Sequence, residues 1–217
     1  MLRVEFHCHT CYSDDSLASP QALLEACRRK QIDRLVVTDH NNIDGALEAQ
    51  QLDPQRIIVG EEVRTTGGEL LAFFVQQAVP RGLAPLAAIE RLRAQGAFIS
   101  VSHPMDRMRG WQKPTLLEIL PYIDAIETFN SRCIWPSWNK QALLFARQHD
   151  LPGTSGSDAH TPEEVGQSTM MMEDFKDADE LRRVIRQAVA HNRLSGWGVH
   201  FASSKAMEMK RGKLFHT

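Results

Sequence analysis

The chain has 217 residues, 42% of them hydrophobic, which is enough for one sizeable core. Its 25 Lys and Arg nearly balance 27 Asp and Glu, so the net charge gives no reason to expect duplex nucleic acid or a membrane surface as a partner. No stretch reaches the roughly 18 apolar residues of a membrane-spanning helix, and the chain opens in a strand-like run without a leader. We therefore predict one cytoplasmic domain with no membrane partner and with its four cysteines reduced.

The first half of the chain alternates β-rich runs with amphipathic stretches. In chain order we predict a strand at Leu2–Phe6, a helix at Pro20–Lys30, a strand at Arg34–Thr38, a helix at about Asp44–Gln50 and a strand at Arg56–Val63. After the Gly67-Gly68 turn, Glu69–Val75 is expected to return as a hairpin, followed by a helix at Pro85–Gln95 and a strand at Ala97–Ser102.

The second half continues the alternation. The further helices and strands are predicted at Pro114–Leu120, Ala125–Phe129, Pro136–His149, Pro152–Ser157, Ser168–Met172 and Asp177–His191. Counting the hairpin return separately, this gives about seven barrel strands. Such alternation indicates an α/β fold with parallel strands joined by helices, either closed into a barrel or open as a doubly wound sheet.

Polar residues at the ends of the predicted strands favour the barrel. They are His7, His9, Asp39, His40, Glu62, His103, Asn130, Asp158 and His160. A barrel gathers the carboxyl ends of its strands into one ring, so residues far apart in the sequence can share a site. An open sheet would spread them along a crevice.

The strongest local signal is His7-Cys8-His9, because side chains at i and i+2 of a strand share a face and can bind one ion. Imidazoles mixed with carboxylates favour Mn, Zn or Fe over Mg or Ca. There are also more candidate ligands than one tetrahedral ion requires, which predicts a site for two or three divalent metal ions. A Cys8/Cys11 zinc or redox pair is disfavoured, because strand alternation turns Cys8 away from the histidines.

Five ordered motifs carry a resemblance to a known family. They are His7-Cys8-His9-Thr10 with Ser13-Asp14, Thr38-Asp39-His40, Gly60-Glu61-Glu62, Ser102-His103-Pro104, and Gly156-Ser157-Asp158-Ala159-His160. In this order the chain resembles the PHP family, the polymerase and histidinol phosphatase superfamily of metal-dependent phosphoesterases. The resemblance spans nearly the whole chain and implies a distorted, TIM-like (β/α)7 barrel in a single domain with a trinuclear metal centre.

The resemblance also implies which residues bind each ion. One ion would be bound by His7, His9, Glu62 and Asp158; Glu62 would bridge to a second ion that also uses His103; and the third would be bound by Asp14, His40 and His160. The sequence departs from the family pattern at two places. Asp15 stands where a glycine is usual and is the alternative to Asp14. Glu69 stands where relatives often supply a histidine and is the candidate for the further ligand of the second ion.

Candidate substrate contacts follow the strand ends. Arg107 and Arg132 are placed where a guanidinium could bind phosphate oxygens, and Asn130 could orient substrate or water, with Arg64 and Lys113 as further candidates. Asp39 is expected to orient a ligand histidine through its ring N–H. Glu127 has the spacing of an inward-facing residue, but the sequence assigns it no role.

The predicted reaction is metal-dependent hydrolysis of a small phosphomonoester, of the nucleotide or histidinol-phosphate type, by a metal-bridging hydroxide. Glu62, Asp158 and His160 are the predicted catalytic residues, with Asp158 or His160 assisting protonation of the leaving group. The alternatives are a phosphodiesterase or 5′-3′ exonuclease acting on short nucleic acid, a metal-dependent amidohydrolase, and a non-catalytic module. The whole of residues 1–217 is assigned to one domain, with about 196–217 as a C-terminal extension that packs on the barrel.

Overall fold

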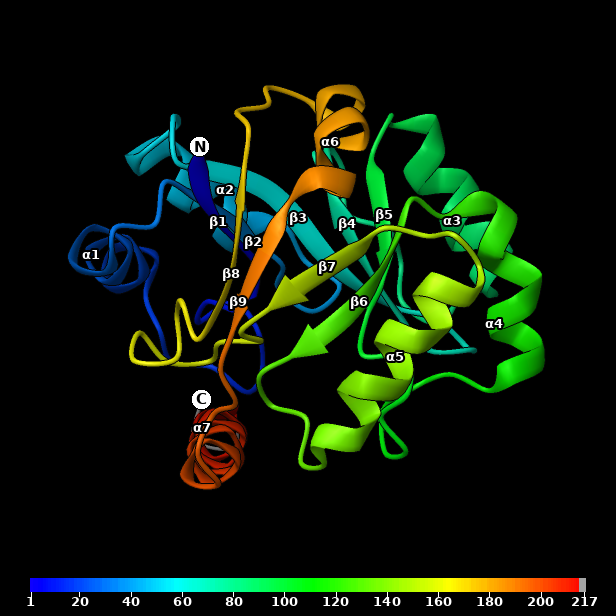
Figure 1. Ribbon diagram of the computed structural model, residues 1–217. Helices are drawn as coiled ribbons and strands as arrows, with labels where there is room; N and C mark the ends of the chain where they lie inside the picture. The colour runs from blue at the N-terminus through cyan, green and yellow to red at the C-terminus, as the bar shows by residue number, and fades with distance from the viewer. Residues whose placement is uncertain (215–217) are drawn as a thin grey trace.

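The structure is a computed structural model that describes residues 1–214; residues 215–217 of the predicted extension lie outside the described residues. Figure 1 shows a curved sheet surrounded by helices. The strands are β1 (Leu2–Cys8), β2 (Arg34–Val37), β3 (Ile57–Arg64), β4 (Glu69–Phe73), β5 (Phe98–Val101), β6 (Ala125–Asn130), β7 (Gly153–Gly156), β8 (Ser168–Met172) and β9 (Val189–Asn192).

The helices lie in the connections between the strands. They are α1 (Pro20–Lys30), α2 (Asp44–Leu52), α3 (Pro85–Ala94), α4 (Lys113–Ile119), α5 (Pro136–Gln148), α6 (Ala178–Val184) and α7 (Gly198–Leu214), with short 3-10 turns η1 (Leu120–Tyr122) and η2 (Ile185–Gln187). Proline in the first turn suits a helix start, because its missing N–H would have no partner there. α1 shows this, with Pro20 following Ser19, whose hydroxyl accepts the amide of Ala22 at 3.2 Å.

The strands form one nine-stranded sheet in the order β7-β6-β5-β4-β3-β2-β1-β8-β9, which curves into a nearly closed barrel. The predicted α/β barrel is thus confirmed, with two differences. β4 is antiparallel to both β3 and β5, so the hairpin return is itself a barrel strand. The predicted helix at Asp177–His191 is wrong over its last residues, which form β9 and pair with β8. The exposed backbone edge of β8 offered a ladder of hydrogen bonds there that outweighed helix propensity.

The barrel closes through one short contact. Leu2–Val4 of β1 pairs with β8, whereas the carboxyl end of β1 bridges to Ala159. The amide of His9 donates to the carbonyl of Ala159 at 2.8 Å, and the amide of Ala159 donates to the carbonyl of His7 at 3.2 Å. We call this contact between residues 7–9 and Ala159 the seam.

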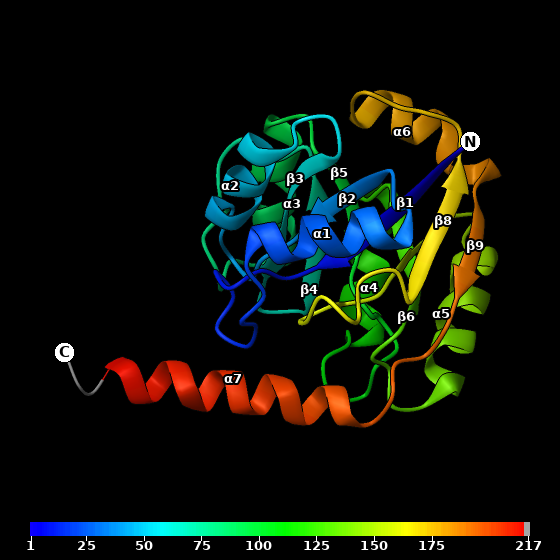
Figure 2. The ribbon, with the colours of Figure 1, turned by 90° about the vertical axis from the view of Figure 1, so that its left-hand side faces the viewer.

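Alternate side chains of the strands build two apolar layers. One packs the sheet against the surrounding helices, and the other fills one end of the barrel, where Phe73 lies between Phe6 and Phe98 with ring centroids 5.3 and 5.5 Å apart. Leu181 of α6 and Ile185 join this second layer. Figures 1 and 2 show α6 at the end where β1 begins and α7 across the opposite end. The interior of the barrel is therefore apolar at the α6 end, and its polar side chains lie at the α7 end.

No helix among residues 1–214 combines the length and the apolar composition that crossing a membrane requires.

Candidate metal centre

Three overlapping groups of donor atoms lie at the carboxyl ends of the parallel strands. They are His7/His9/Glu62, Glu62/Glu69/His103 and His9/His40/His160. Glu62 belongs to two groups because it lies near the end of β3, between the ends of β2 and β5. His40 bridges to Glu62 from the β2 side, and Ser102, just after β5, donates its hydroxyl to Oε1 of Glu62 at 2.7 Å.

The first group, which we call set A, contains His7, His9, Glu62 and Asp158. The Nε2 atoms of His7 and His9 lie 3.1 Å apart, and Oδ1 of Asp158 lies 3.3 Å from Nε2 of His9. Oε2 of Glu62 is 3.3 Å from Nε2 of His7. Two nitrogens that bind one ion at roughly 2.0–2.1 Å each are separated by about this distance. The spacing in set A therefore fits a shared ion.

Set B contains Glu62, Glu69 and His103. Nε2 of His103 lies 3.3 Å from Oε1 of Glu62 and 3.4 Å from Oε2 of Glu69, yet neither ring nitrogen of the buried His103 has a hydrogen-bond partner among the described residues. Glu69 reaches this place because β4 runs antiparallel, which puts its first residue beside the last residues of β3 and β5. A buried imidazole without partners is costly unless a ligand takes its lone pair, so set B also fits an ion.

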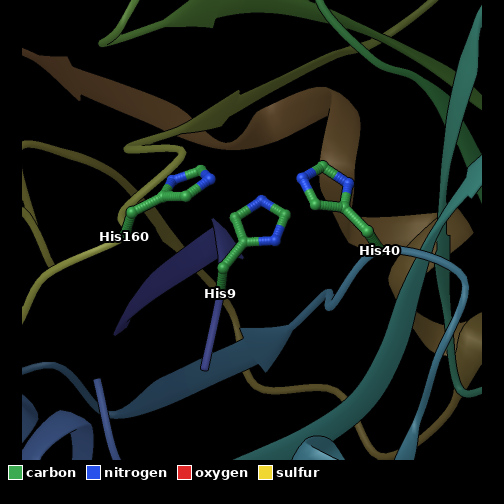
Figure 3. Close-up of side chains that lie close together, drawn as sticks. All are labelled: His9, His40 and His160. Atoms are coloured by element: carbon green, nitrogen blue, oxygen red, sulfur yellow. The ribbon is translucent and has the colours of Figure 1, made fainter. Parts of the chain in front are cut away.

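Set C contains His9, His40, His160 and Asp15. Figure 3 shows the three imidazoles converging, and the ring centroid of His9 is 4.4 Å from that of His40 and 4.2 Å from that of His160. Oδ2 of Asp15 lies 3.0 Å from Nε2 of His160 and 3.4 Å from Nε2 of His40.

The structure therefore places Asp15 at the position predicted for Asp14. The side chain of Asp14 is exposed and lines the neighbouring cavity, while Oδ1 of Asp15 is buried and has no hydrogen-bond partner within the described part of the chain. The turn that follows β1 decides this orientation. Its first hydrogen bond joins the amide of Ser13 to the carbonyl of Thr10, and spacing along the sequence does not reveal which of the two following carboxylates then faces inward.

Hydrogen bonds orient the ligand imidazoles. Nδ1 of His7 donates to Oε1 of Glu127 at 2.9 Å, and Nδ1 of His160 donates to the carbonyl of Asp158 at 2.8 Å. Nδ1 of His9 lies 3.2 Å from the hydroxyl of Ser13. With each Nδ1 used in this way, each Nε2 faces the donor sets and is the ring atom that would bind an ion.

Two residues that the sequence did not assign, Glu5 and Glu127, complete this arrangement. Oε2 of Glu127 also accepts the amide of His103 at 2.8 Å. Glu5 accepts the amides of Ser157 at 2.9 Å and Gly166 at 3.0 Å, and so fixes the loop that carries Asp158. Its signal in the sequence is an ionisable residue within an apolar strand, which requires a buried partner.

Asp39 acts differently from the prediction. Its carboxylate makes no hydrogen bond with an imidazole of residues 1–214; Oδ1 accepts the hydroxyl of Ser13 at 2.6 Å, and Oδ2 accepts the hydroxyl of Thr10 at 2.6 Å. Ser13 is the residue that His9 contacts, so Asp39 orients a histidine through one intervening hydroxyl.

The buried carboxylates and histidines of the donor sets shift one another's pKa values. Burial would lower the pKa of His7, but Glu62 and Asp158 raise it well above its usual value. Burial opposes ionisation of Glu62 and Asp158 as well, yet neighbouring His7 holds both carboxyl pKa values well below their usual range. Burial, with His160 and His40 nearby, lowers the pKa of His9 to about 4, so that its ring is neutral. Anionic carboxylates beside a neutral imidazole are the donor set that Mn, Zn or Fe prefers.

Glu127→Gln is expected to weaken metal binding by about 10- to 100-fold, because an amide orients the His7 ring less firmly than a carboxylate does. Isothermal titration with Mn²⁺ measures this, and Glu118→Gln, an exposed glutamate on α4, is the matched control. Equal affinities in the two variants would contradict this role of Glu127.

The three predicted substrate contacts lie in different surroundings in the structure. The amide nitrogen of Asn130 donates to Oε2 of Glu127 at 3.1 Å and to Oδ2 of Asp158 at 3.2 Å. Arg107 is exposed and lies outside the lining of the cavity; Arg109, which the sequence did not single out, donates to Oδ2 of Asp158 at 2.7 Å. Arg132 is buried and lies 3.3 Å from the carboxylate of Glu164.

The donor sets open into a cavity of about 1030 Å³. Arg64 lies in its lining, whereas Lys113 lies in a separate apolar groove between α4 and α5. The cations that line the cavity are Arg64, Arg81, Arg109, Arg132, Lys210 and Arg211. A pocket of this size with convergent charges suits a small anionic ligand.

The sequence matches the models of a known protein family. Residues 5–108 match the model of the PHP domain, and residues 136–189 match that of a PHP-associated segment. An uncharacterized protein of Methanocaldococcus jannaschii is 37% identical over 171 residues, which cover 76% of this chain and 68% of that protein.

Solved structures share the fold. A candidate metal-dependent phosphoesterase from Bifidobacterium adolescentis aligns with a TM-score of 0.63 at 17% identity, over 86% of this chain and 96% of that chain. An amidohydrolase from Chromobacterium violaceum gives 0.63 at 15%, over 84% and 97%. A lesion-specific endonuclease from Pyrococcus furiosus gives 0.62 at 16%, over 86% of this chain but 56% of the endonuclease.

Four of the five motifs lie in the PHP-domain match, and the fifth, at residues 156–160, lies in the PHP-associated match. The donor sets of the structure draw on both matched regions and suit divalent ions. The chain therefore belongs to the PHP family and is a metal-dependent hydrolase.

Proposed function

We propose that the chain hydrolyses a phosphate ester at a centre of two or three divalent ions, and that its substrate is a small phosphomonoester of the nucleotide or histidinol-phosphate type. One observation carries this proposal: three donor sets converge around Glu62 at the edge of a cavity lined by arginine and lysine. Several neighbouring cations suit phosphoryl transfer, in which negative charge is spread over the oxygens of the phosphate.

Bound at sets A, B and C, divalent ions would lower the pKa of water towards ~7 and so supply a nucleophile at neutral pH. The protein's own contribution is orientation and charge. Glu62 would connect sets A and B through its two oxygens, and Asp158, fixed by Arg109 and Asn130, would present Oδ1 to the histidines of β1. We assign Asp15 as the carboxylate of set C, with Asp14 as the alternative, and Glu69 as a ligand of set B.

The cations in the cavity would position the substrate. Arg109 contacts a donor-set residue directly, because its guanidinium donates to Asp158, and it replaces Arg107 as our candidate for the phosphate contact. Arg64, Arg81 and Arg211 lie in the same lining and make no ion pair with any described residue, so their charges remain available to an anion. A volume near 1030 Å³ accommodates a molecule of nucleotide size.

The runner-up is cleavage of phosphodiesters by an exonuclease, and the alternative from another class is hydrolysis of an amide, the activity named for the structural neighbour from Chromobacterium violaceum. These two activities would require different cavities. A nucleic-acid strand needs a continuous path past the donor sets, whereas an amide needs no excess of cations. The unpaired arginines thus favour a phosphate ester over an amide.

A substrate panel with Mn²⁺ tests the proposal. It contains nucleoside monophosphates, histidinol phosphate, dinucleotides, short oligonucleotides and simple amides, with release of phosphate or product as the readout. We expect the highest kcat/KM for a phosphomonoester. Faster cleavage of oligonucleotides would select the exonuclease, and turnover restricted to amides would overturn the proposal.

A further inference from the structure

The C-terminal helix α7 forms one wall of the cavity. Figure 2 shows it lying across the end of the barrel. Its residues that line the cavity are His200, Ser203, Ser204, Met207, Lys210 and Arg211, which recur at helical spacing and therefore share one face. Ser203 and Ala206 on this side are buried, while Phe201 and Lys205 are exposed. The helix is thus packed along one face, with more contact than a fully solvated terminal helix would make.

The first turn of α7 is tied to the loop that carries His160. The guanidinium of Arg132 donates to the carbonyl of Val199 at 2.7 Å and to the hydroxyl of Ser203 at 2.9 Å. The same guanidinium lies 3.3 Å from Oε1 of Glu164, whose Oε2 accepts the amide of His160 at 3.1 Å. Arg132 and Glu164 therefore connect α7 with one ligand of set C.

The other end of α7 is tied to the turn that carries Asp15. Nζ of Lys210 donates to the carbonyl of Cys11 at 2.6 Å and also to the carbonyl of Ser13. These carbonyls lie two to four residues before Asp15, the carboxylate of set C. An ammonium group bound to two carbonyls of one turn restricts the backbone freedom that an unattached loop would keep.

Hydrogen bonds from α7 therefore reach both sides of set C. Among residues 1–214 they reach no residue of β3 or β4, which carry Glu62 and Glu69. The backbones of β3 and β4 hold Glu62 and Glu69 in place, and Glu5 fixes the loop that carries Asp158, whereas Asp15 depends on a turn. Set C is thus the part of the centre whose geometry depends on α7.

We propose that Lys210 is a positioning residue that holds Asp15 against His40 and His160, so that the ion of set C binds at full affinity only when α7 is docked. This inference rests on the proposed metal centre. It also assigns α7 a role in the assembly of the site, in addition to covering it. Residues that support a ligand in this way commonly change metal affinity by about 10- to 100-fold when they are replaced.

The test is metal stoichiometry and affinity in the full chain, measured by elemental analysis and by titration with Mn²⁺. Lys210→Met removes the donors and keeps most of the side chain. Lys210→Arg restores donors to the two carbonyls, and Lys205→Met, on the exposed side of α7, is the matched control. We expect Lys210→Met to keep two ions at wild-type affinity and to bind the third about 10- to 100-fold more weakly. Lys210→Arg should recover much of the loss, and Lys205→Met should match the wild type.

Wild-type affinity for the third ion in Lys210→Met would overturn the proposal, as would an equal loss at all ions. A wild-type chain that binds fewer than three ions would overturn it too. If the wild type binds three ions but turns over no phosphate ester, the proposed function fails, and the comparison of Lys210 variants still decides whether α7 positions Asp15.

Discussion

Glu62→Gln is expected to reduce kcat/KM by about a thousandfold or more and to remove at least one ion from the purified protein. The carboxylate of Glu62 lies within 3.5 Å of nitrogens from four histidines, His7, His9, His40 and His103. An amide keeps the shape but loses the negative charge and one acceptor oxygen. Loss of several kcal/mol of charge stabilisation, at ~1.4 kcal/mol for each factor of ten, gives the expected size.

The adjacent residue provides the control for this variant. Glu61 is also buried, but it points away from the donor sets, accepts the amide of Val79 at 2.9 Å and has its pKa raised by burial to about 7. Glu61→Gln replaces a carboxyl group that is already partly neutral, so activity and metal content should stay near those of the wild type. Steady-state kinetics and elemental analysis of both variants measure the difference. Equal activity in the two variants would remove Glu62 from the centre.

Loading the chain with Mn²⁺ is expected to raise its melting temperature by about 5–10 °C. At a free concentration 100 times Kd, one site stabilises the folded state by ~2.7 kcal/mol. For a domain of this size each kcal/mol shifts the midpoint by about 2–4 °C. Binding at a second or third set would add to the shift, and Nε2 of His103 would gain a partner.

Scanning calorimetry in a chelator and in excess Mn²⁺ measures this shift. Mg²⁺ is the comparison ion, since it prefers oxygen ligands and retains its waters, and it should stabilise the chain less. Unchanged melting temperatures in chelator and in Mn²⁺ would show that the imidazole and carboxylate sets do not bind the ion.

The sequence predicted the barrel and much of the ring of side chains because strand ends fix position. Residues such as His7, His103 and Asp158 come directly at or after β-rich runs, and the ends of barrel strands meet whatever their distance in the sequence. Glu69 was proposed from the resemblance to the PHP family, and the hairpin return brings it back to the end of the preceding strand.

The side chains of the loops could not be placed from the sequence, because the conformation of a loop depends on distant groups. The choice between Asp14 and Asp15 is made in a turn that Lys210 contacts from the far end of the chain. Arg109 contacts Asp158 only because the loop after His103 folds back, and nothing in the local spacing separates Arg109 from Arg107. Arg132, expected to contact a phosphate, lies in the lining of the cavity and also pairs with Glu164 and donates to α7.

The seam is a place where the barrel can open transiently. The end of β1 and the segment after β7 are joined by the bridge at Ala159, and Gly156 packs so closely on His7 that a Cβ there would overlap the histidine's own. Set A takes His7 and His9 from one bank of this seam and Asp158 from the other. An ion in set A would therefore join the two sides of the seam, and slow opening fluctuations of the metal-free chain would begin at the amides of His9 and Ala159. The groups assigned to catalysis would then also complete the closure of the barrel.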